Sequence, residues 1–489
     1  MTVKVIDAVF LLFFVFCQLR QTEHRTPDRT LSYLPICSKI IELYSIPFIN
    51  FSDMGYRIKL LLLTATTFLE WIGTSYLVSP PQPTRLRAND DIPEYSSYTG
   101  FKNQVYHWRG QRIRYIAAGP KDSTCTVLLI HGLFVNADTW RQTLTKLGEA
   151  GYRTYALDLL GSGYSSKPIP DSLEAKLLNG ENGRFHESVE MEPPVDQNSN
   201  SQLCTHSRKR CQSRLQQPMR ENVVLGTRFG GRRIVKQLNL RHPLNSCYNF
   251  YTWADQINDF TNDVIFDGAA KKEDGSPKNT SLIGNSKGCI VALQAFLDKP
   301  EYYNGVCAID PTYREQHEAE MKFKFVKQYL VRIVQSFIRS RGHGIYNFIV
   351  RRRGIINKLL HEPFYNHTVI DGELLAAIAE PLNLPHSSDI VFNELSYSTG
   401  PLFEQQLQDI NDIPNNKRKT IWVMYGKNDP WIHPERVESL ITTPFSENDT
   451  PVVNRVIAID DAGHCPQVER PEEVGELLIE FLKTSKNPE

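Results

Sequence analysis

The sequence lacks three features that would place it in a specialised class of protein. Its 55 lysines and arginines are balanced by 55 aspartates and glutamates, so the chain has no net charge, which argues against a nucleic-acid binder or an acidic tail protein. No apolar run reaches the length of a confident membrane span. The nine cysteines form no Cys-x-x-Cys pair, which excludes a disulfide scaffold or a thioredoxin-like site and gives no zinc signature. The length of 489 residues fits one large enzyme domain with appendages, or two domains.

Residues 1–95 are expected to form an N-terminal targeting or signal-like region and a linker. Residues 9–17 (VFLLFFVFC) are a short apolar run whose length suits a signal-peptide core. A second run, in which Arg57 and Lys59 precede four leucines, is the better signal peptide of the two. One hypothesis is therefore that the chain starts at Met54. The alternative is that one of the runs is an amphipathic or anchoring helix.

Most of the remaining chain alternates between strand and helix patterns. Residues 126–130 (TVLLI) have the continuous apolar pattern of a central parallel strand, and a helix pattern over 139–149 is followed by a strand pattern over 153–157. This alternation predicts an α/β fold with a mostly parallel central sheet and helices on both faces. The predicted core comes in three parts: 96–168, 246–312 and 413–489.

The α/β pattern is interrupted at residues 169–245. Residues 171–197 carry seven acids against two bases, and residues 208–241 carry ten bases against one acid. Because neither stretch has helical or strand periodicity, we expect a mostly disordered insertion. The basic half could touch acidic lipid or nucleic acid, but its composition favours a solvated loop. A third, non-physical explanation of residues 169–245 is that they are encoded by a retained intron.

The strongest chemical signal is Gly284-Asn285-Ser286-Lys287-Gly288, which follows an apolar strand and opens a helix. That context is typical of a G-x-S-x-G nucleophile elbow, in which a tight turn lifts the serine hydroxyl above the sheet. The adjoining helix N-terminus favours negative charge. Ser286 is therefore the predicted nucleophile.

A second signal, His131-Gly132-Leu133-Phe134, comes directly after the strand at 126–130. The glycine lets the backbone turn sharply, so the N–H of Leu133 can point at the site. Together with the N–H of Lys287 it would form an oxyanion hole. The alternative is an ordinary strand-to-helix turn.

Two further strand ends supply an acid and a base. Asp429 follows the strand TIWVMYG, where its carboxylate can accept Nδ1–H of a histidine, and His464 lies in a loop after VIAID from which Nε2 can reach the serine. The chain order Ser, Asp, His is that of α/β-hydrolases. Asp310, at the end of the strand GVCAI, competes for the role of the acid.

Seven segments appear in a fixed order: HGLFVNADTW, ALDLLGSGYSSKP, NFYTWADQINDF, GNSKG, SYSTGPL, GKNDPW and AGHCPQVERPEEV. Together they resemble the plastid serine α/β-hydrolases that include pheophytinase, which removes the phytyl tail from pheophytin. The resemblance covers roughly residues 105–168 and 248–485. It implies an α/β-hydrolase fold in which the largely helical block 313–412 is a cap over the serine.

The resemblance also implies roles for individual residues and a location in the chloroplast. By matching motif positions, Ser286 is the nucleophile, His464 the base, Asp429 its orienting acid, and Leu133 and Lys287 the oxyanion-hole donors. The N-terminal region would then be a signal or transit peptide; a secretory or membrane-anchored location is the alternative.

The elbow departs from the family pattern GNSLGG at two positions. Lys287 replaces an apolar residue, and its charge near the site mouth would favour an acidic or polar substrate. Cys289 replaces a glycine and would crowd the helix against the neighbouring strand.

The predicted function is hydrolysis of a carboxylic ester, hydrophobic and pigment- or lipid-like, through a Ser–His–Asp triad and an acyl-enzyme. No metal or organic cofactor is needed, and no nucleic-acid partner is expected. Arg351 begins a run of three arginines, a pattern that is usually solvated; contact with an anionic membrane surface is the alternative. The alternatives are a serine carbon–carbon bond hydrolase and a hydrolase-fold ligand receptor with slow turnover.

Overall fold

The computed structural model describes most of the unit Asp90–Glu489. The described residues are 92–182, 222–229, 232–268, 279–314, 317, 343–344, 346–411, 413, 419–432, 434–442 and 452–486. The predicted signal-like runs lie outside the described residues, as does the central part of the predicted insertion, 183–221.

An eight-stranded sheet forms the centre of the fold, in the order β1-β2-β4-β3-β7-β8-β9-β10. Its strands are β1 (Gln104–Trp108), β2 (Gln111–Ala118), β3 (Thr126–Ile130), β4 (Arg153–Leu157), β7 (Thr280–Asn285), β8 (Tyr303–Ile309), β9 (Thr420–Gly426) and β10 (Arg455–Ile459). The six strands from β4 to β10 run parallel, whereas β1 and β2 form an antiparallel hairpin at one edge. The parallel strands end at one edge, and the predicted chemical residues follow those ends.

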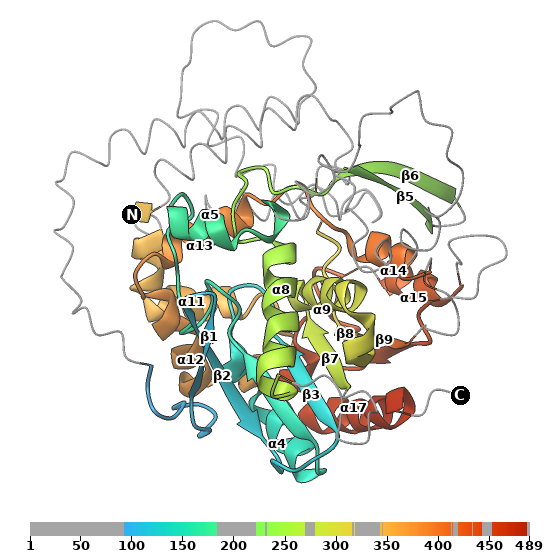
Figure 1. The fold of residues 1–489 in the computed structure, drawn as a ribbon. Helices are drawn as coiled ribbons and strands as arrows, with labels where there is room; N and C mark the ends of the chain where they lie inside the picture. Colours follow the sequence, from blue (N-terminus) through green and yellow to red (C-terminus); the bar gives the residue numbers. More distant parts are fainter. Residues whose placement is uncertain are drawn as a thin grey trace, which may run out of the picture. The chain divides into compact units, whose positions relative to one another are not determined.

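Helices cover both faces of the sheet, as the strand–helix alternation predicts. On one face lie α8 (Phe250–Phe260) and α9 (Lys287–Asp298), visible in front of the sheet in Figure 1; the other face packs against α4 (Arg141–Glu149) and α17 (Pro471–Lys486). Successive side chains of β3 divide between the two cores: Leu128 points into the first and Leu129 into the second. Both faces of this strand are therefore buried, which explains its continuous apolar sequence.

Shorter helical segments connect these elements. They are the 3₁₀ helices η2 (Ala137–Trp140) and η4 (Pro300–Tyr302), the π-helical turn η3 (Thr261–Ile265), and the helices α15 (Pro434–Thr442) and α16 (Pro466–Glu469).

In the described part of the predicted cap region, the structure places α11 (Arg353–Leu360), the 3₁₀ turn η6 (His367–Val369), α12 (Gly372–Leu382), α13 (Ser387–Leu395) and α14 (Phe403–Asn411). The helices α11, α12, α13 and α14 do not all pack alike. The first three share a hydrophobic cluster with Cys465 and Val468, next to the predicted catalytic histidine. Helix α14 differs, because Phe403, Leu407 and Ile410 bury its apolar stripe in the core that contains α9. Among the described residues, α11 to α13 therefore belong to the cap, whereas α14 belongs to the core.

The structure differs from the expectation of disorder at two stretches within 169–245. Helix α5 (Leu173–Leu178) begins at Ser172, whose hydroxyl accepts the N–H of Ala175, and it buries Leu178 in the core. Strands β5 (Asn222–Phe229) and β6 (Arg232–Asn239) pair antiparallel, with Phe229 opposite Arg232, and Gly230-Gly231 stands between them in the sequence. That Gly-Gly pair between two β-branched runs was the overlooked signal, because the high arginine content obscured it.

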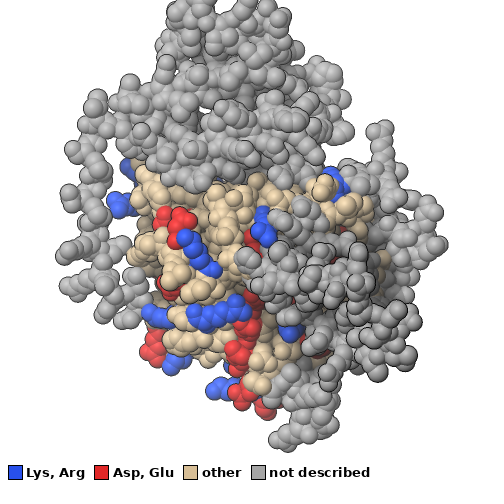
Figure 2. Space-filling model, turned by 45° about the horizontal axis from the view of Figure 1, so that its top comes forward, with Lys and Arg blue, Asp and Glu red and all other residues tan. Residues whose placement is uncertain are grey.

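The surface shows the balanced charge of the sequence. On the face drawn in Figure 2, Lys and Arg side chains alternate with Asp and Glu side chains rather than gathering into a patch of one sign. Exposed ion pairs also occur among the described residues, such as that of Arg141 with Glu373. No helix in the described part of the chain combines the length and the apolarity that a membrane span needs.

Candidate active site

Ser286 occupies a strained turn between β7 and α9. Its backbone has φ of 55° and ψ of −119°, a conformation that non-glycine residues adopt rarely and mostly at functional sites. The two glycines of the motif make the turn possible. A Cβ on Gly284 would lie 2.5 Å from the carbonyl oxygen of Gly288, and one on Gly288 would lie 2.3 Å from that of Ile130. Helix α9 can therefore start directly against β3 and β7, with Ser286 at the apex.

The loop after β3 passes directly beside this serine. A Cβ on Gly132 would come within 3.1 Å of Cβ of Ser286, so a side chain at this position would crowd the serine. Leu133 follows in the same loop. Lys287 is the first residue of α9, a position whose N–H has no acceptor within the helix. Of the two predicted oxyanion donors, Lys287 thus adjoins Ser286 in the sequence, and Leu133 directly follows the glycine that packs against Ser286.

His131 fixes the shape of this loop. Its Nε2 accepts the N–H of Leu159 at 3.0 Å, which leaves the proton on Nδ1 to be donated to the carbonyl oxygen of Gly132 at 2.8 Å. Burial, together with the nearby charge of Lys287, lowers the pKa of His131 to about 3. A neutral imidazole therefore holds the Gly132 carbonyl in place. His131 belongs to the predicted motif, but the sequence did not indicate this role.

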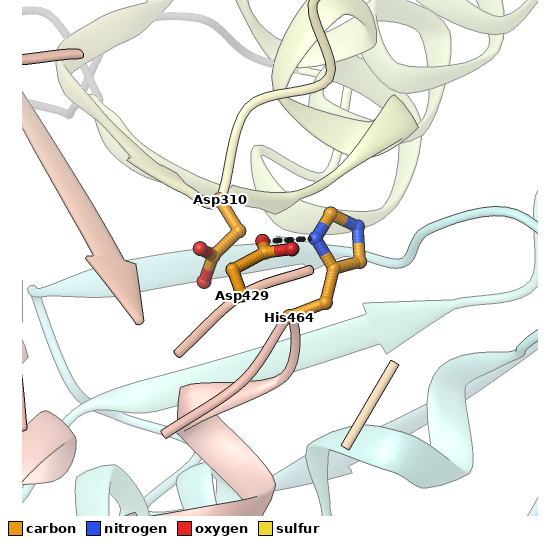
Figure 3. A group of neighbouring side chains, drawn as sticks. All are labelled: Asp310, Asp429 and His464. Carbon is orange, nitrogen blue, oxygen red and sulfur yellow. Dashed lines mark hydrogen bonds and ion pairs between the residues drawn. The ribbon is translucent and has the colours of Figure 1, made fainter. Parts of the chain in front are cut away.

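His464 and Asp429 form a direct hydrogen bond. Nδ1 of His464 donates to Oδ2 of Asp429 at 2.6 Å, and both side chains are buried (Figure 3). Oδ1 of Asp429 accepts the N–H of Trp431 at 2.7 Å, and the Trp431 ring packs edge-on against the imidazole. Burial acts to raise the pKa of Asp429, but the interactions with His464 and Trp431 outweigh it and hold that pKa below its usual value. An ionised Asp429 leaves Nε2 of His464 as its basic nitrogen.

One further hydrogen bond links the serine turn to the histidine loop. The side-chain amide of Asn285, next to Ser286, donates to the carbonyl oxygen of His464 at 3.2 Å. The structure therefore brings the three predicted catalytic residues to the carboxyl edge of the sheet, Ser286 after β7, Asp429 after β9 and His464 after β10.

Asp310, the competing acid, belongs to the same cluster. It is fully buried, and Oδ1 accepts the N–H of Gly426 at 2.9 Å. Donor atoms of Asp310, Asp429 and His464 lie within 4.8 Å of one another, a spacing that a metal ion could also bridge. The direct contact between His464 and Asp429 instead joins two of the three groups by a hydrogen bond.

Glu469 is a supporting residue for which the sequence predicted no role. Oε1 accepts the N–H of Gly463 at 2.9 Å, while Oε2 accepts the N–H groups of Tyr365 and Asn366 at 2.9 and 2.7 Å. The carboxylate therefore joins the histidine loop to the cap loop before η6. Its place in the segment AGHCPQVERPEEV was the available signal.

A family model covers most of this structure. Residues 127–477 match the model described as "Alpha/beta hydrolase family". The chain belongs to the α/β-hydrolase family. Its fold is the α/β-hydrolase fold predicted from the sequence, with a mostly parallel sheet, helices on both faces and a helical cap.

Individual relatives of this hydrolase align over limited length or at low identity. Human (Homo sapiens) ABHD14B, whose name carries a provisional protein-lysine deacylase assignment, is 34% identical over 80 residues, which span 16% of this chain and 38% of that protein. Among solved structures, a lipase-like protein (lip1) from Acinetobacter baumannii AYE is 15% identical with a TM-score of 0.48, over 80% of this chain and 94% of the other. A thermophilic esterase from Thermogutta terrifontis is 16% identical with a TM-score of 0.45, over 78% and 99%.

The side chain of Lys287 does not present a free charge at the mouth of the hydrolase site. It is buried, and Nζ lies 3.1 Å from both carboxylate oxygens of Glu394 on cap helix α13. Nζ also lies 4.3 Å from the centre of the Trp253 ring. The expectation of an acid-selecting lysine is corrected accordingly. The sequence could not indicate the partner, because Glu394 lies 107 positions away.

Cys289 also fits without the expected crowding. Its thiol is buried and donates toward the carbonyl oxygens of Gly284 and Ile309 at 3.2 and 3.3 Å. Burial raises the pKa of this thiol well above its usual value. The side chain therefore behaves as a small packed group and not as a nucleophile.

Proposed function

We propose that this hydrolase cleaves carboxylic esters with Ser286 as nucleophile, His464 as general base and Asp429 as the acid that orients it. One observation carries the proposal. Ser286, held at positive φ beside Gly132, lies at the same edge of the sheet as the buried, hydrogen-bonded His464–Asp429 pair. These are the positional requirements of a nucleophile and its base.

The reaction would proceed in two steps. Oγ of Ser286 attacks the ester carbonyl carbon while Nε2 of His464 takes the hydroxyl proton. The resulting oxyanion accepts hydrogen bonds from the backbone N–H groups of Leu133 and Lys287. The loss of one such donor typically costs about 2.7–4 kcal/mol of transition-state stabilisation. His464 then protonates the leaving alcohol, and water, activated by the same imidazole, hydrolyses the acyl-enzyme.

We infer that the substrate is a hydrophobic ester of the pigment or lipid-like class that pheophytinase cleaves. The segments that resemble that family support this inference, and the pairing of Lys287 with Glu394 removes the objection that a free charge would face a greasy substrate. Two exposed aromatic rings support it as well: Phe134 follows the oxyanion loop, and Trp431 contacts His464.

The test is hydrolysis by the purified protein beside its Ser286→Ala variant, with Ser123→Ala as a matched control before β3. Substrates are pheophytin, p-nitrophenyl esters of graded chain length, an acyl-lysine peptide and a vinylogous diketone. Ser286-dependent pheophytin cleavage is expected. Cleavage of simple esters alone would leave a carboxylesterase of other specificity, and acyl-lysine cleavage would indicate the activity named for the human relative. Cleavage of the diketone alone would indicate carbon–carbon hydrolysis. Slow turnover, or none, of all four substrates would favour the ligand-receptor alternative.

The same resemblance supports a plastid location, directed by residues 1–95. A fusion of that segment to a fluorescent protein is expected to accumulate in chloroplasts. Accumulation in the secretory pathway or at a membrane would contradict this location. The sequon at Asn366 would then be available for glycosylation, which a glycosidase-sensitive shift in mass would reveal.

A further inference from the structure

Asp310 lies beside the proposed catalytic pair, and the mechanism above does not use it. It follows β8 at φ of 46°, and its side chain is fully buried. One of its carboxyl oxygens lies within 4.8 Å of an oxygen of Asp429 and of a ring nitrogen of His464. Figure 3 shows the carboxyl group of Asp310 on the side of Asp429 away from the imidazole. Two acids therefore adjoin one base.

The two oxygens of Asp310 have different surroundings. Oδ1 accepts the N–H of Gly426 at 2.9 Å. Oδ2 is buried and meets no hydrogen-bond donor among the residues that the structure describes. A buried anionic oxygen without a donor is costly, whereas a protonated Oδ2 is itself a donor, and the neighbouring carboxylate of Asp429 can accept its proton.

The charges around Asp310 favour the same assignment. The titratable groups that face it from the surrounding elements are acids, thiols, phenols and one imidazole: Asp429, Glu469, Cys289, Cys465, Tyr313, Tyr425 and His464. The imidazole already donates to Asp429. Burial, and next the repulsion from Asp429, raise the pKa of Asp310 well above its usual value, while the pKa of Asp429 is lowered. Two carboxyl groups this close cannot both ionise cheaply.

We propose that Asp310 is a positioning residue: it remains a neutral carboxylic acid and donates a hydrogen bond from Oδ2 to Asp429. This inference rests on the proposed triad. Asp429 then accepts from Asp310 as well as from Trp431 and His464, which keeps it ionised and aimed at Nδ1. Because Asp310 keeps its proton, the imidazole faces one negative charge instead of two.

The backbone holds Asp310 on the strand that carries its partner. Its N–H donates to the carbonyl oxygen of Met424 at 2.8 Å, and its Oδ1 accepts from Gly426. Both lie at the end of β9, directly before the turn that leads to Asp429. Asp310 is thus hydrogen-bonded to the end of β9, where the turn begins, and under the proposal its Oδ2 donates to the Asp429 carboxylate, where the turn ends.

The first test measures the proton directly and needs no substrate. Infrared spectra are recorded at pH 7 for wild-type protein and Asp310→Asn, each with unlabelled and carboxyl-¹³C aspartate. The wild type is expected to show a carboxylic-acid C=O band that shifts with the label and is missing from Asp310→Asn. The absence of that band from the wild type would overturn the proposal, whether or not the variants fold.

The second test separates positioning from a general structural role. The Asp310→Ala variant loses the donor, so its kcat/KM is expected to fall about 10- to 100-fold, mainly through kcat. In Asp310→Asn the amide N–H replaces the acid O–H, so most of that loss should be recovered, with the acidic limb of the pH profile unmoved. An acidic limb shifted to lower pH in Asp310→Asn would mean that Asp310 is anionic in the wild type. Equal losses in the two variants would also contradict the proposal.

A failure of the triad itself would look different. Wild-type protein is first labelled with a fluorophosphonate, and Ser286→Ala serves as the unlabelled control. If the wild type is not labelled, the proposed function fails, while the infrared result still decides the protonation of Asp310. If labelling depends on Ser286 and the two Asp310 variants lose equal activity, only the positioning role fails.

Discussion

Lys287 combines two contributions that its place in the sequence does not separate. Its backbone N–H belongs to the proposed oxyanion hole, whereas its side chain pairs with Glu394 of cap helix α13. Only 7% of either side chain is exposed, so solvent does little to screen the pair. The ion pair therefore connects the nucleophile turn to the cap.

This buried pair should show strong coupling in stability. Glu394→Leu leaves the lysine charge buried and unpaired, so we expect it to destabilise the protein by about 3–5 kcal/mol, while the double variant Lys287→Met/Glu394→Leu should recover most of that loss. Urea unfolding of the wild type, both single variants and the double variant measures the coupling. The exposed Arg455–Glu480 pair is the control, and Glu480→Leu should change stability little. Additive losses in the two singles would argue against a coupled pair.

Asp429 should matter for rate far more than for substrate binding. Asp429→Asn replaces the acceptor of Nδ1–H by an amide that can donate, which favours the wrong tautomer of His464. We expect kcat to fall by about 10⁴-fold with little change in KM. Asp461→Asn, at an exposed position in the loop that leads to His464, is the matched control. A variant Asp429→Asn near wild-type activity would transfer the acid role to Asp310.

At the scale of elements, Glu469 joins two loops that come from different parts of the chain. Its carboxylate accepts one N–H from the histidine loop and two from the cap loop. Glu469→Gln replaces one acceptor oxygen by a donor that faces an N–H. We expect faster amide hydrogen exchange at 364–366 and 463–465, roughly tenfold for each 1.4 kcal/mol lost, with reduced kcat. Glu472→Gln, on the exposed face of α17, should leave both unchanged; equal exchange in the two variants would contradict this role.

The elements differ in how well the sequence predicted them, and packing explains the difference. The strand at 126–130 was predicted with its observed bounds, because both of its faces are buried and every position is apolar. The serine turn was predicted because its glycines, which leave room for neighbouring backbone atoms, stand within two residues of Ser286 in the sequence. The β5–β6 hairpin was missed, since its arginines resemble a solvated segment, and the assignment of α14 to the cap overlooked its burial against α9.

The site followed the same rule. Strand-end residues were predictable, because parallel strands bring their carboxyl ends to one edge. The Lys287–Glu394 pair and the contact between Asp310 and Asp429 were not, since each joins residues more than a hundred positions apart whose contact only the folded chain creates.

At the scale of the whole molecule, two buried histidines far apart in the sequence make stability depend on pH. Nδ1 of His131 donates to the carbonyl oxygen of Gly132 in the proposed oxyanion loop, and Nε2 of His242 donates to the carbonyl oxygen of Asn393 in the cap. Burial lowers the pKa of each to about 3, against an ordinary value of 6.5. Between pH 6.5 and 3 the two histidines are therefore protonated in the unfolded chain but neutral in the folded protein. Stability is fully present above pH 6.5 and is lost as the pH falls from there toward 3.

We expect this loss to amount to about 2 kcal/mol for each of the two histidines at pH 5. Urea unfolding at a series of pH values between 7.5 and 4.5 measures it. His242→Gln removes one titrating group, so its stability should fall less steeply with acidification than that of the wild type, even if its stability at neutral pH is lower. His107→Gln, at an exposed position on β1, should leave the slope unchanged. A parallel decline in the wild type and His242→Gln would mean that His242 takes up its proton in the folded protein, and the acid sensitivity would then belong to other groups.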